Sequence, residues 1–103
     1  MLETRVEHGP DSTVYLTGEM DLDCADALRG AAMSVAVDTY QLTLDFGGVR
    51  FIDSSGTGIF VRLCLDLLQQ GVKVRVRSLT PQVQQVFDML KVHELVGEEI
   101  FPE

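Results

Sequence analysis

A carboxylate and two hydroxyl groups follow one another at Asp53, Ser54 and Ser55, in the segment FIDSSGTGIF at residues 51–60. One apolar run ends at Asp53, and a second begins at Ile59. This pattern is typical of the start of a helix, where the first amides have no acceptor within the helix and the helix dipole is positive. One interpretation is a helix cap made by Asp53 or Ser54. The other is a serine that another protein phosphorylates, because the same amides can hold a phosphate.

Two glycines, Gly56 and Gly58, come directly after this group of polar residues. Because glycine has no Cβ, a second backbone or a phosphate can come close to the chain at these positions. A phosphate on Ser54 or Ser55 is therefore compatible with a folded helix. From the residues alone, the cap and the modified serine both remain open.

Other kinds of chemistry are not supported by the spacing of the reactive residues. The segment is not the Gly-x-Ser-x-Gly of a nucleophile elbow, and it lacks the Gly-Lys-Ser/Thr of a phosphate-binding loop. His8 and His93 lie in unrelated segments, and the aspartates at 21–26 lack the spacing of a calcium loop. Cys24 and Cys64 are expected to be free thiols with packing roles. The sequence thus predicts no catalytic residue, no metal site, no cofactor and no enzyme activity.

The composition narrows the class of partner. The chain has 103 residues, of which 46% are hydrophobic, so we expect one folded domain over residues 1–103. Sixteen acidic and eight basic residues give a formal net charge of −8, which argues against binding to nucleic acid or to an acidic membrane surface. No apolar stretch reaches the ~18 residues of a membrane span, and no secretory signal is visible. We therefore expect a cytoplasmic protein, without membrane insertion, whose partners are proteins.

The hydrophobic patterns predict an α/β domain in the order β-β-α-β-α-β-α-(β), in which (β) stands for a short last strand in the tail, residues 98–103. The predicted strands cover residues 2–7, 13–18, 40–46 and 71–78, and the first two form a hairpin. The predicted helices cover residues 24–37, 54–70 and 81–90, with Asp23 and Thr80 as the N-caps of the first and the last. Residues 47–50 are expected to form a loop. Strands separated by helices pair in parallel, so we expect a mixed central sheet with helices packed on it.

The helix predicted from Ser54 has a wide apolar face. Phe60, Leu63 and Leu67 are expected to point toward the sheet at helical spacing. Val61 and Leu65 lie beside that face and widen the apolar arc to roughly 200°, whereas a surface helix needs a stripe of about 100°. Either a neighbouring loop covers these two residues, or they contact a partner protein.

Three segments resemble a known family. LTGEMDLDCADAL at 16–28, LDFGGVRFIDSSGTGIFVRL at 44–63 and SLTPQVQQVFDMLKVHEL at 78–95 look like the bacterial anti-sigma factor antagonists, which are single STAS domains. The resemblance runs over roughly residues 3–96 in the same order. It implies that the unmodified protein binds an anti-sigma factor that is also an ATP-dependent serine kinase, and thereby frees a sigma factor.

The resemblance also implies a switch and its residues. The kinase would phosphorylate the serine after the aspartate, which is Ser54 here in preference to Ser55. The phosphorylated protein would then dissociate from the kinase, and a phosphoserine phosphatase would remove the phosphate and restore binding. The partner surface would comprise Asp21, Asp53, Ser54, Ser55, Gly56 and Thr57, with Val61 and Leu65 added by the apolar pattern. A phosphoserine adds about −1.5 to −2 charges at neutral pH, so the modification would repel a partner built to meet a neutral serine.

A second class of function is open to STAS domains. Relatives of this kind serve as non-catalytic subunits of lipid-transport ATPases or as parts of stress-signalling scaffolds. The Asp-Ser-Ser-Gly run favours the switch, because a transport subunit needs no serine that can be phosphorylated.

Overall fold

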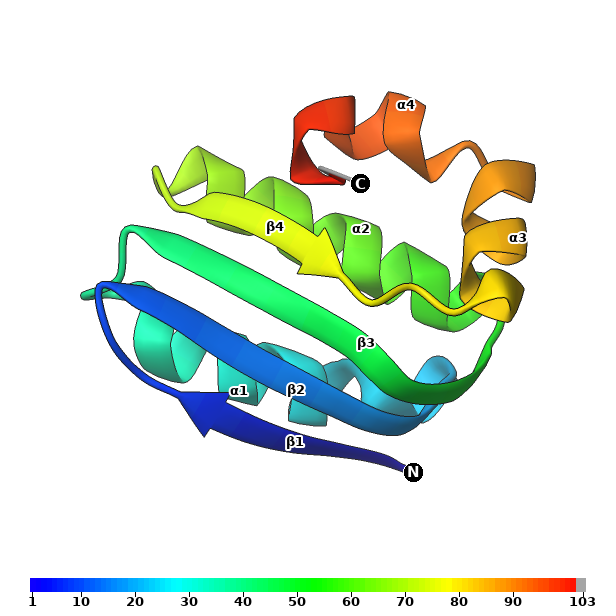
Figure 1. Cartoon of the computed structure of the whole chain (residues 1–103), viewed down its shortest axis with the longest axis horizontal. Helices are drawn as coiled ribbons and strands as arrows, with labels where there is room; N and C mark the ends of the chain where they lie inside the picture. The colour runs from blue at the N-terminus through cyan, green and yellow to red at the C-terminus, as the bar shows by residue number, and fades with distance from the viewer. Residues whose placement is uncertain (102–103) are drawn as a thin grey trace.

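The computed structural model describes residues 1–101, in which strands and helices alternate after a first hairpin (Figure 1). The strands are β1 (Leu2–Glu7), β2 (Asp11–Met20), β3 (Gln41–Ile52) and β4 (Lys73–Arg77). The α-helices are α1 (Ala25–Ala36), α2 (Ser54–Gln69), α3 (Pro81–Met89) and α4 (Val92–Val96). Two short 3-10 helices, η1 (Leu22–Cys24) and η2 (Glu98–Ile100), complete the order. None of the helices in this part of the chain is long and apolar enough to cross a membrane.

The four strands form one mixed sheet in the order β1-β2-β3-β4. β1 pairs with β2 antiparallel, whereas β2 with β3 and β3 with β4 pair in parallel. The parallel pairing follows from the connections. α1 links β2 to β3 and α2 links β3 to β4, and each helix returns the chain to the end of the sheet from which the next parallel strand starts. Both crossover helices, α1 and α2, lie behind the sheet as it is drawn in Figure 1, and its other face is open. The mixed sheet with packed helices is confirmed.

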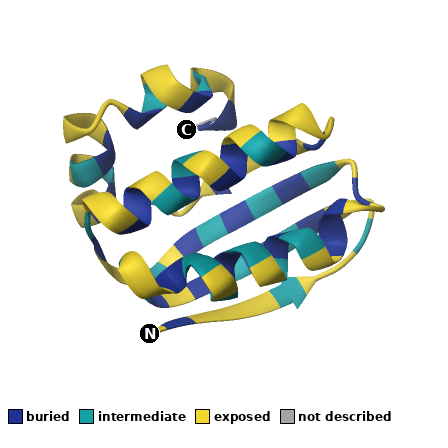
Figure 2. Cartoon of the chain, turned by 180° about the vertical axis from the view of Figure 1, so that it is seen from behind, coloured by how far each residue is buried: buried dark blue, intermediate teal, exposed yellow. Residues whose placement is uncertain are grey.

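A cluster of three phenylalanines holds α3 to the rest of the domain. Phe46 of β3, Phe60 of α2 and Phe87 of α3 are fully buried. Their ring centroids lie 5.1–5.7 Å apart, in stacked and edge-to-face arrangements that add to the stabilisation from burial. Figure 2 shows the buried stripe of α2 turned toward the sheet. The first turns of α2 are therefore fixed against the core through Phe60.

The loop predicted at residues 47–50 is wrong, because β3 continues through it to Ile52. β2 also runs longer than predicted, and Thr17 and Gly18 of β2 pair with Gly48 and Val49 of β3 across a register shift. A Cβ on Gly48 would lie 2.7 Å from the Thr17 Oγ1 atom and 2.8 Å from the Leu16 carbonyl oxygen. The glycine thus marks an irregular and close strand pair rather than a turn.

Two further predictions need correction at helix ends. Asp23 does not cap the first helix. Instead, Asp21 is the N-cap of η1 and its Oδ1 atom accepts a hydrogen bond of 3.0 Å from the Asp23 amide. The tail strand is also wrong in the part described, where residues 98–100 form η2, and residues 102–103 of that prediction lie outside the described residues. The cap at Thr80 is confirmed, since its hydroxyl accepts a hydrogen bond from the Val83 amide.

The end of β2 and the start of α2 meet through their backbones. The Met20 carbonyl oxygen accepts a hydrogen bond of 3.3 Å from the Asp53 amide. A Cβ on Gly56 would lie 1.9 Å from the same oxygen, a separation that no folded chain can hold. Only glycine at position 56 allows this approach, and a side chain there would push α2 away from β2.

We expect Gly56→Ala to lower the free energy of unfolding by about 3 kcal/mol, because the added methyl group overlaps the Met20 backbone. Gly58→Ala is the matched control, since nothing lies within 4 Å of a Cβ at that position. It should raise the free energy of unfolding by up to about 1 kcal/mol, because alanine is the better helix former. Urea unfolding followed by circular dichroism measures both. Equal midpoints for the two variants would contradict the close contact.

Candidate functional site

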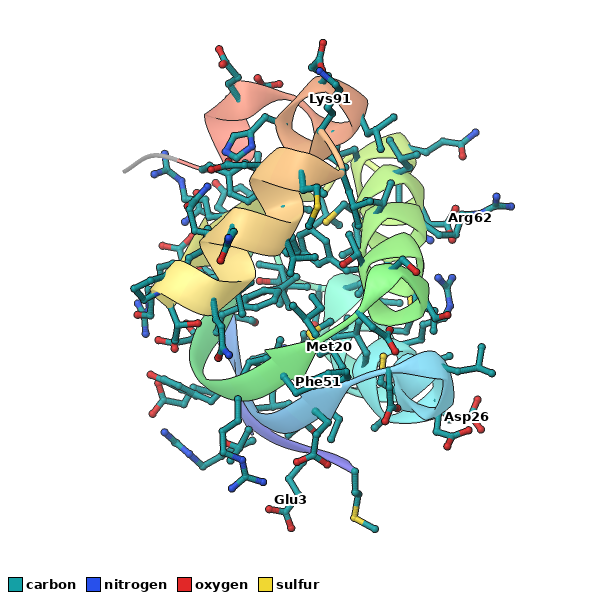
Figure 3. The ribbon with its side chains drawn as sticks, turned by 90° about the vertical axis from the view of Figure 1, so that its right-hand side faces the viewer. Glu3, Met20, Asp26, Phe51, Arg62 and Lys91 are labelled. Carbon is teal, nitrogen blue, oxygen red and sulfur yellow. The ribbon has the colours of Figure 1, made fainter. Side chains whose placement is uncertain are left out.

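The candidate site is the corner where β3 passes into α2. Figure 3 shows the side of the molecule on which this corner lies, the right-hand side of Figure 1. Asp53 is the N-cap of α2 and its Oδ1 atom accepts a hydrogen bond of 2.8 Å from the Gly56 amide. The Asp53 carbonyl oxygen accepts a second one, of 2.9 Å, from the Thr57 amide. The cap is therefore made by Asp53 and not by Ser54.

This arrangement leaves both serines available. Ser54 and Ser55 are the first two residues of α2, and both are exposed. Because the Asp53 carboxylate satisfies the capping amide, the hydroxyl of Ser54 is not required for the start of the helix. An enzyme can reach it without opening the fold.

Asp21 lies in the same corner. It follows Met20, whose carbonyl oxygen contacts the start of α2, and a Cβ on Gly56 would lie 3.0 Å from the Asp21 amide nitrogen. Both carboxylates lie near the buried Cys24 thiol. Burial raises the pKa of this thiol most, and the negative charges of Asp21 and Asp53 raise it further. Two carboxylates of neighbouring caps thus border the exposed serines, and the corner is acidic before any modification.

Two residues expected at the partner surface lie inside the domain. Gly56 is buried against the end of β2, and Thr57 is only 3% exposed. The Thr57 hydroxyl donates a hydrogen bond of 2.8 Å to the Asp53 carbonyl oxygen. These residues form the inner side of the first helical turn, so their role is to hold the corner in place.

The two apolar residues singled out on α2 differ in exposure. Val61 is half-buried and packs against the core, whereas Leu65 is 44% exposed. Leu68, which the helical pattern places toward the sheet, is 38% exposed. Part of the wide apolar arc of α2 is therefore open to a partner.

Sequence reasoning missed two exposed apolar side chains that are close in sequence to the two capping aspartates. Leu22 is 72% exposed between Asp21 and Asp23, and Phe51 is 49% exposed two residues before Asp53. No regular alternation signals Phe51, because β3 is irregular here: Val49 and Ile52 are buried, whereas Arg50 and Phe51 between them are both exposed. Phe51 lines a hollow together with Val86 and Met89 on the side of α3, and Leu22 lies on η1 directly after Asp21.

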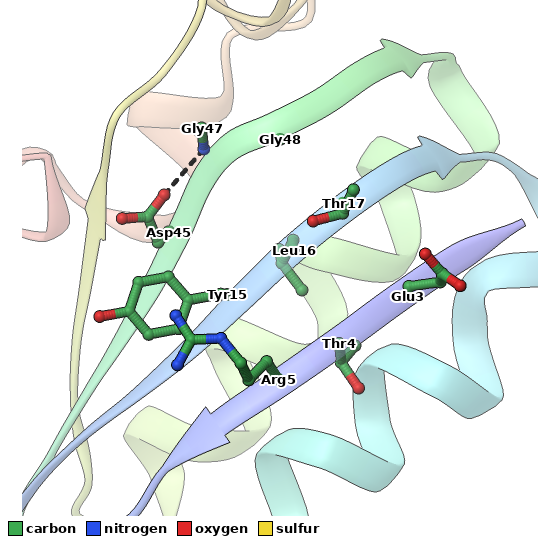
Figure 4. Close-up of a pocket in the computed structure, with 9 residues that line it drawn as sticks. All are labelled: Glu3, Thr4, Arg5, Tyr15, Leu16, Thr17, Asp45, Gly47 and Gly48. Atoms are coloured by element: carbon green, nitrogen blue, oxygen red, sulfur yellow. Dashed lines mark hydrogen bonds between the residues drawn. The ribbon is translucent and has the colours of Figure 1, made fainter.

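A larger hollow lies elsewhere, on the open face of the sheet (Figure 4). It has a volume of about 550 Å³ and is lined from three strands, by residues that include Arg5, Tyr15 and Asp45. Two of its charged side chains, Arg5 and Asp45, already have partners. The Arg5 guanidinium lies 4.0 Å from the centre of the Tyr15 ring, and Arg77 Nε donates a hydrogen bond of 2.8 Å to Asp45. None of its lining residues belongs to α2, so it is separate from the serines.

Metal-binding geometry is not found among residues 1–101, where no group of three or more histidine, cysteine, aspartate or glutamate side chains could hold an ion. The aspartates at 21–26 are therefore not gathered around a common centre. Within the described part of the chain, Asp21 acts as a cap and Asp23 and Asp26 are exposed.

Comparison with known proteins gives a consistent result. The anti-sigma-B factor antagonist of Bacillus subtilis (strain 168) is 26% identical over 86 residues, which cover 84% of this chain and 79% of that protein. The crystal structure of an anti-sigma factor antagonist from Mycobacterium paratuberculosis is 27% identical, with a TM-score of 0.73 over 91% of this chain and 81% of that one. The phosphorylated form of the Bacillus cell fate determinant SpoIIAA shares the fold, with a TM-score of 0.65 at 16% identity, over 92% of this chain and 87% of that one. The STAS domain family matches residues 2–103, and the chain belongs to that family.

Proposed function

We propose that this STAS domain is an anti-sigma factor antagonist that is switched off by phosphorylation of Ser54. The unmodified form binds an anti-sigma factor with ATP-dependent serine kinase activity in the cytoplasm and so releases the sigma factor. Phosphorylated Ser54 ends the binding, and a phosphoserine phosphatase restores it. The chain acts by binding and not by catalysis. The observation that carries the proposal is that Asp53 caps α2 and leaves the adjacent Ser54 exposed.

The fold is suited to accept the phosphate. Ser54 lies at the N-terminal end of α2, a helix of 16 residues, where the dipole favours negative charge. The capping bond from the Gly56 amide to Asp53 does not involve the serine and can persist after modification. The relatives named as anti-sigma factor antagonists support the same function.

The switch would act through charge on an unchanged scaffold. A phosphoserine adds about −1.5 to −2 charges beside Asp53 and Asp21. A kinase surface that fits the neutral hydroxyl, with Leu22 and Phe51 as apolar neighbours, would then meet like charge and an anion that is costly to desolvate. A loss of ~3 kcal/mol of binding free energy lowers the affinity more than a hundredfold.

We expect Ser54→Ala to retain kinase binding and to lose phosphorylation, because it removes the hydroxyl but not the cap. Ser54→Asp should keep the fold and lose binding, because it places a charge in the contact. Ser55→Ala is the matched control and should still be phosphorylated. Incubation with ATP and the candidate kinases of the host, followed by mass mapping, locates the phosphate, and calorimetry measures binding.

Each alternative gives a different result in this experiment. A phosphate found on Ser55 would move the switch by one residue. Unfolding of Ser54→Asp would show that Ser54 is a structural residue. A non-catalytic subunit of a lipid-transport ATPase should stay unmodified and copurify with that ATPase, and a scaffold component should copurify with its complex.

The loss of affinity on phosphorylation should shrink as salt is added. A repulsion between exposed like charges is screened, since the Debye length falls from about 10 Å at 0.1 M to about 3 Å at 1 M ionic strength. The measurement is the ratio of the dissociation constants of the phosphorylated and unmodified forms over that range. A ratio that does not change with salt would mean that the phosphate excludes the kinase by its size.

A further inference from the structure

Almost all basic side chains of the described chain are paired with carboxylates, and the exceptions lie together. The sequence has eight lysines and arginines and sixteen aspartates and glutamates. Within residues 1–101, six basic side chains approach a carboxylate to 2.8–3.9 Å: Arg5, Arg29, Arg50, Arg62, Arg77 and Lys91. Lys73 and Arg75 form no such pair with a described residue. Because acids outnumber bases two to one, two adjacent unpaired cations are unexpected.

Lys73 and Arg75 lie on the same face of an edge strand. β4 is the last strand of the sheet, and these residues pair in register with Gln41 and Thr43 of β3. Val74, between them, is 3% exposed and points into the core, so its neighbours point to the open face that Figure 1 shows in front. Alternate residues of a strand are about 6.6 Å apart, and this is the spacing of the two charges.

Apolar surface borders Lys73. This lysine lines a hollow of about 260 Å³ that includes Tyr40, which is 68% exposed. A second hollow of about 260 Å³ lies at the outer edge of β4, where Lys73 and Arg75 meet Leu68 of α2 and Ile100 of η2, which come from the covered face of the sheet (Figure 2). Tyr40, Lys73 and Arg75 are called the β4 surface below. Glu99 lines the second hollow as well and is the one carboxylate among the described residues that line either hollow.

We propose that the β4 surface binds an extended acidic segment of a partner protein. In an extended chain, alternate side chains point the same way at a spacing of about 6.6 Å, so two carboxylates two residues apart can pair with Lys73 and Arg75 together. The arginine can bind its carboxylate through two parallel hydrogen bonds. An apolar residue of the segment then fits the hollow beside Tyr40.

A protein segment fits this surface better than a nucleic acid does. The net charge of −8 repels a polyanion over most of the molecule. A nucleic-acid site needs several basic residues to neutralise successive phosphates, and among residues 1–101 only two lysines or arginines lack a carboxylate partner. A short segment with two carboxylates presents the matching number of charges.

This surface is independent of the Ser54 switch. In the sheet, Lys73 lies opposite Gln41, the first residue of β3. Asp53 and Ser54 follow Ile52, the last residue of β3. The twelve residues of β3 separate the two surfaces by roughly 30 Å. This separation is well beyond the Debye length of about 8 Å at physiological ionic strength, so a charge at Ser54 should not change binding at β4.

The test titrates the isotopically labelled full chain with a capped synthetic peptide that alternates glutamate and valine, and follows the amide signals by NMR. We expect saturable shifts confined to β4 and to the start of β3, which weaken as salt is added. Lys73→Glu/Arg75→Glu should lower the affinity about tenfold or more. The matched control, Arg62→Glu/Lys91→Glu, changes the net charge equally and should bind as the original chain does, as should Ser54→Asp.

Four outcomes would overturn the proposal. These are no saturable binding of the acidic peptide, equal affinity of the two double variants, shifts centred on Ser54, and equal binding of a peptide with lysine in place of glutamate. Tighter binding of a short DNA duplex to the same residues would assign the surface to nucleic acid instead. If the glutamate pair disturbs the fold, Lys73→Gln/Arg75→Gln provides the same comparison with a smaller change.

Discussion

The backbone contact between Met20 and Gly56 is the constraint on which the geometry of the candidate site depends. It seats the first turn of α2 against the end of β2, and the Asp53 amide donates to the same carbonyl oxygen. Each chain segment then turns into a helix under its own aspartate cap, Asp21 for η1 and Asp53 for α2. The two carboxylates are stabilised by the amides that they cap, which offsets the cost of placing like charges in one corner. Ser54 is exposed in this corner and the capping bond does not use its hydroxyl, so the proposed modification does not require the cap to open.

The parts of the fold that follow from local pattern were predictable, and those that depend on neighbours were not. The alternation of valine with lysine and arginine in residues 73–77, and the cap at Thr80, are local signals, and both agree with the structure. Residues 47–50 contain two glycines and look like a turn. They remain in β3 because Gly48 permits a close approach of Thr17 that only the paired strand can show. The choice of Asp21 over Asp23 as the cap likewise depends on where β2 ends, at Met20, and not on residue type.

The same distinction applies to the candidate site. At the start of α2 the helical spacing separates the inner side of the first turn from the outer one. Thr57 lies three residues before the buried Phe60 and is itself buried, whereas Ser55 lies off that face and is exposed. The partner surface expected from the family resemblance did not take this spacing into account. Asp21 was assigned to the partner surface only through the family resemblance. From the residues alone its position could not be known, because it follows from β2 and β3 being parallel neighbours whose carboxyl ends meet at one edge of the sheet.

Charge is distributed unevenly along β3, and this bears on how the molecule could serve more than one partner. The end next to Ser54 carries the carboxylates of Asp21 and Asp53, whereas the end next to β4 carries Lys73 and Arg75, which have no carboxylate partner among residues 1–101. The rings of Phe46, Phe60 and Phe87 pack against one another in the core between them. Electrostatic coupling over this distance is screened in physiological salt. Binding at one end should therefore leave affinity at the other unchanged. Two partners held on one rigid domain would then gain effective concentration for each other rather than compete.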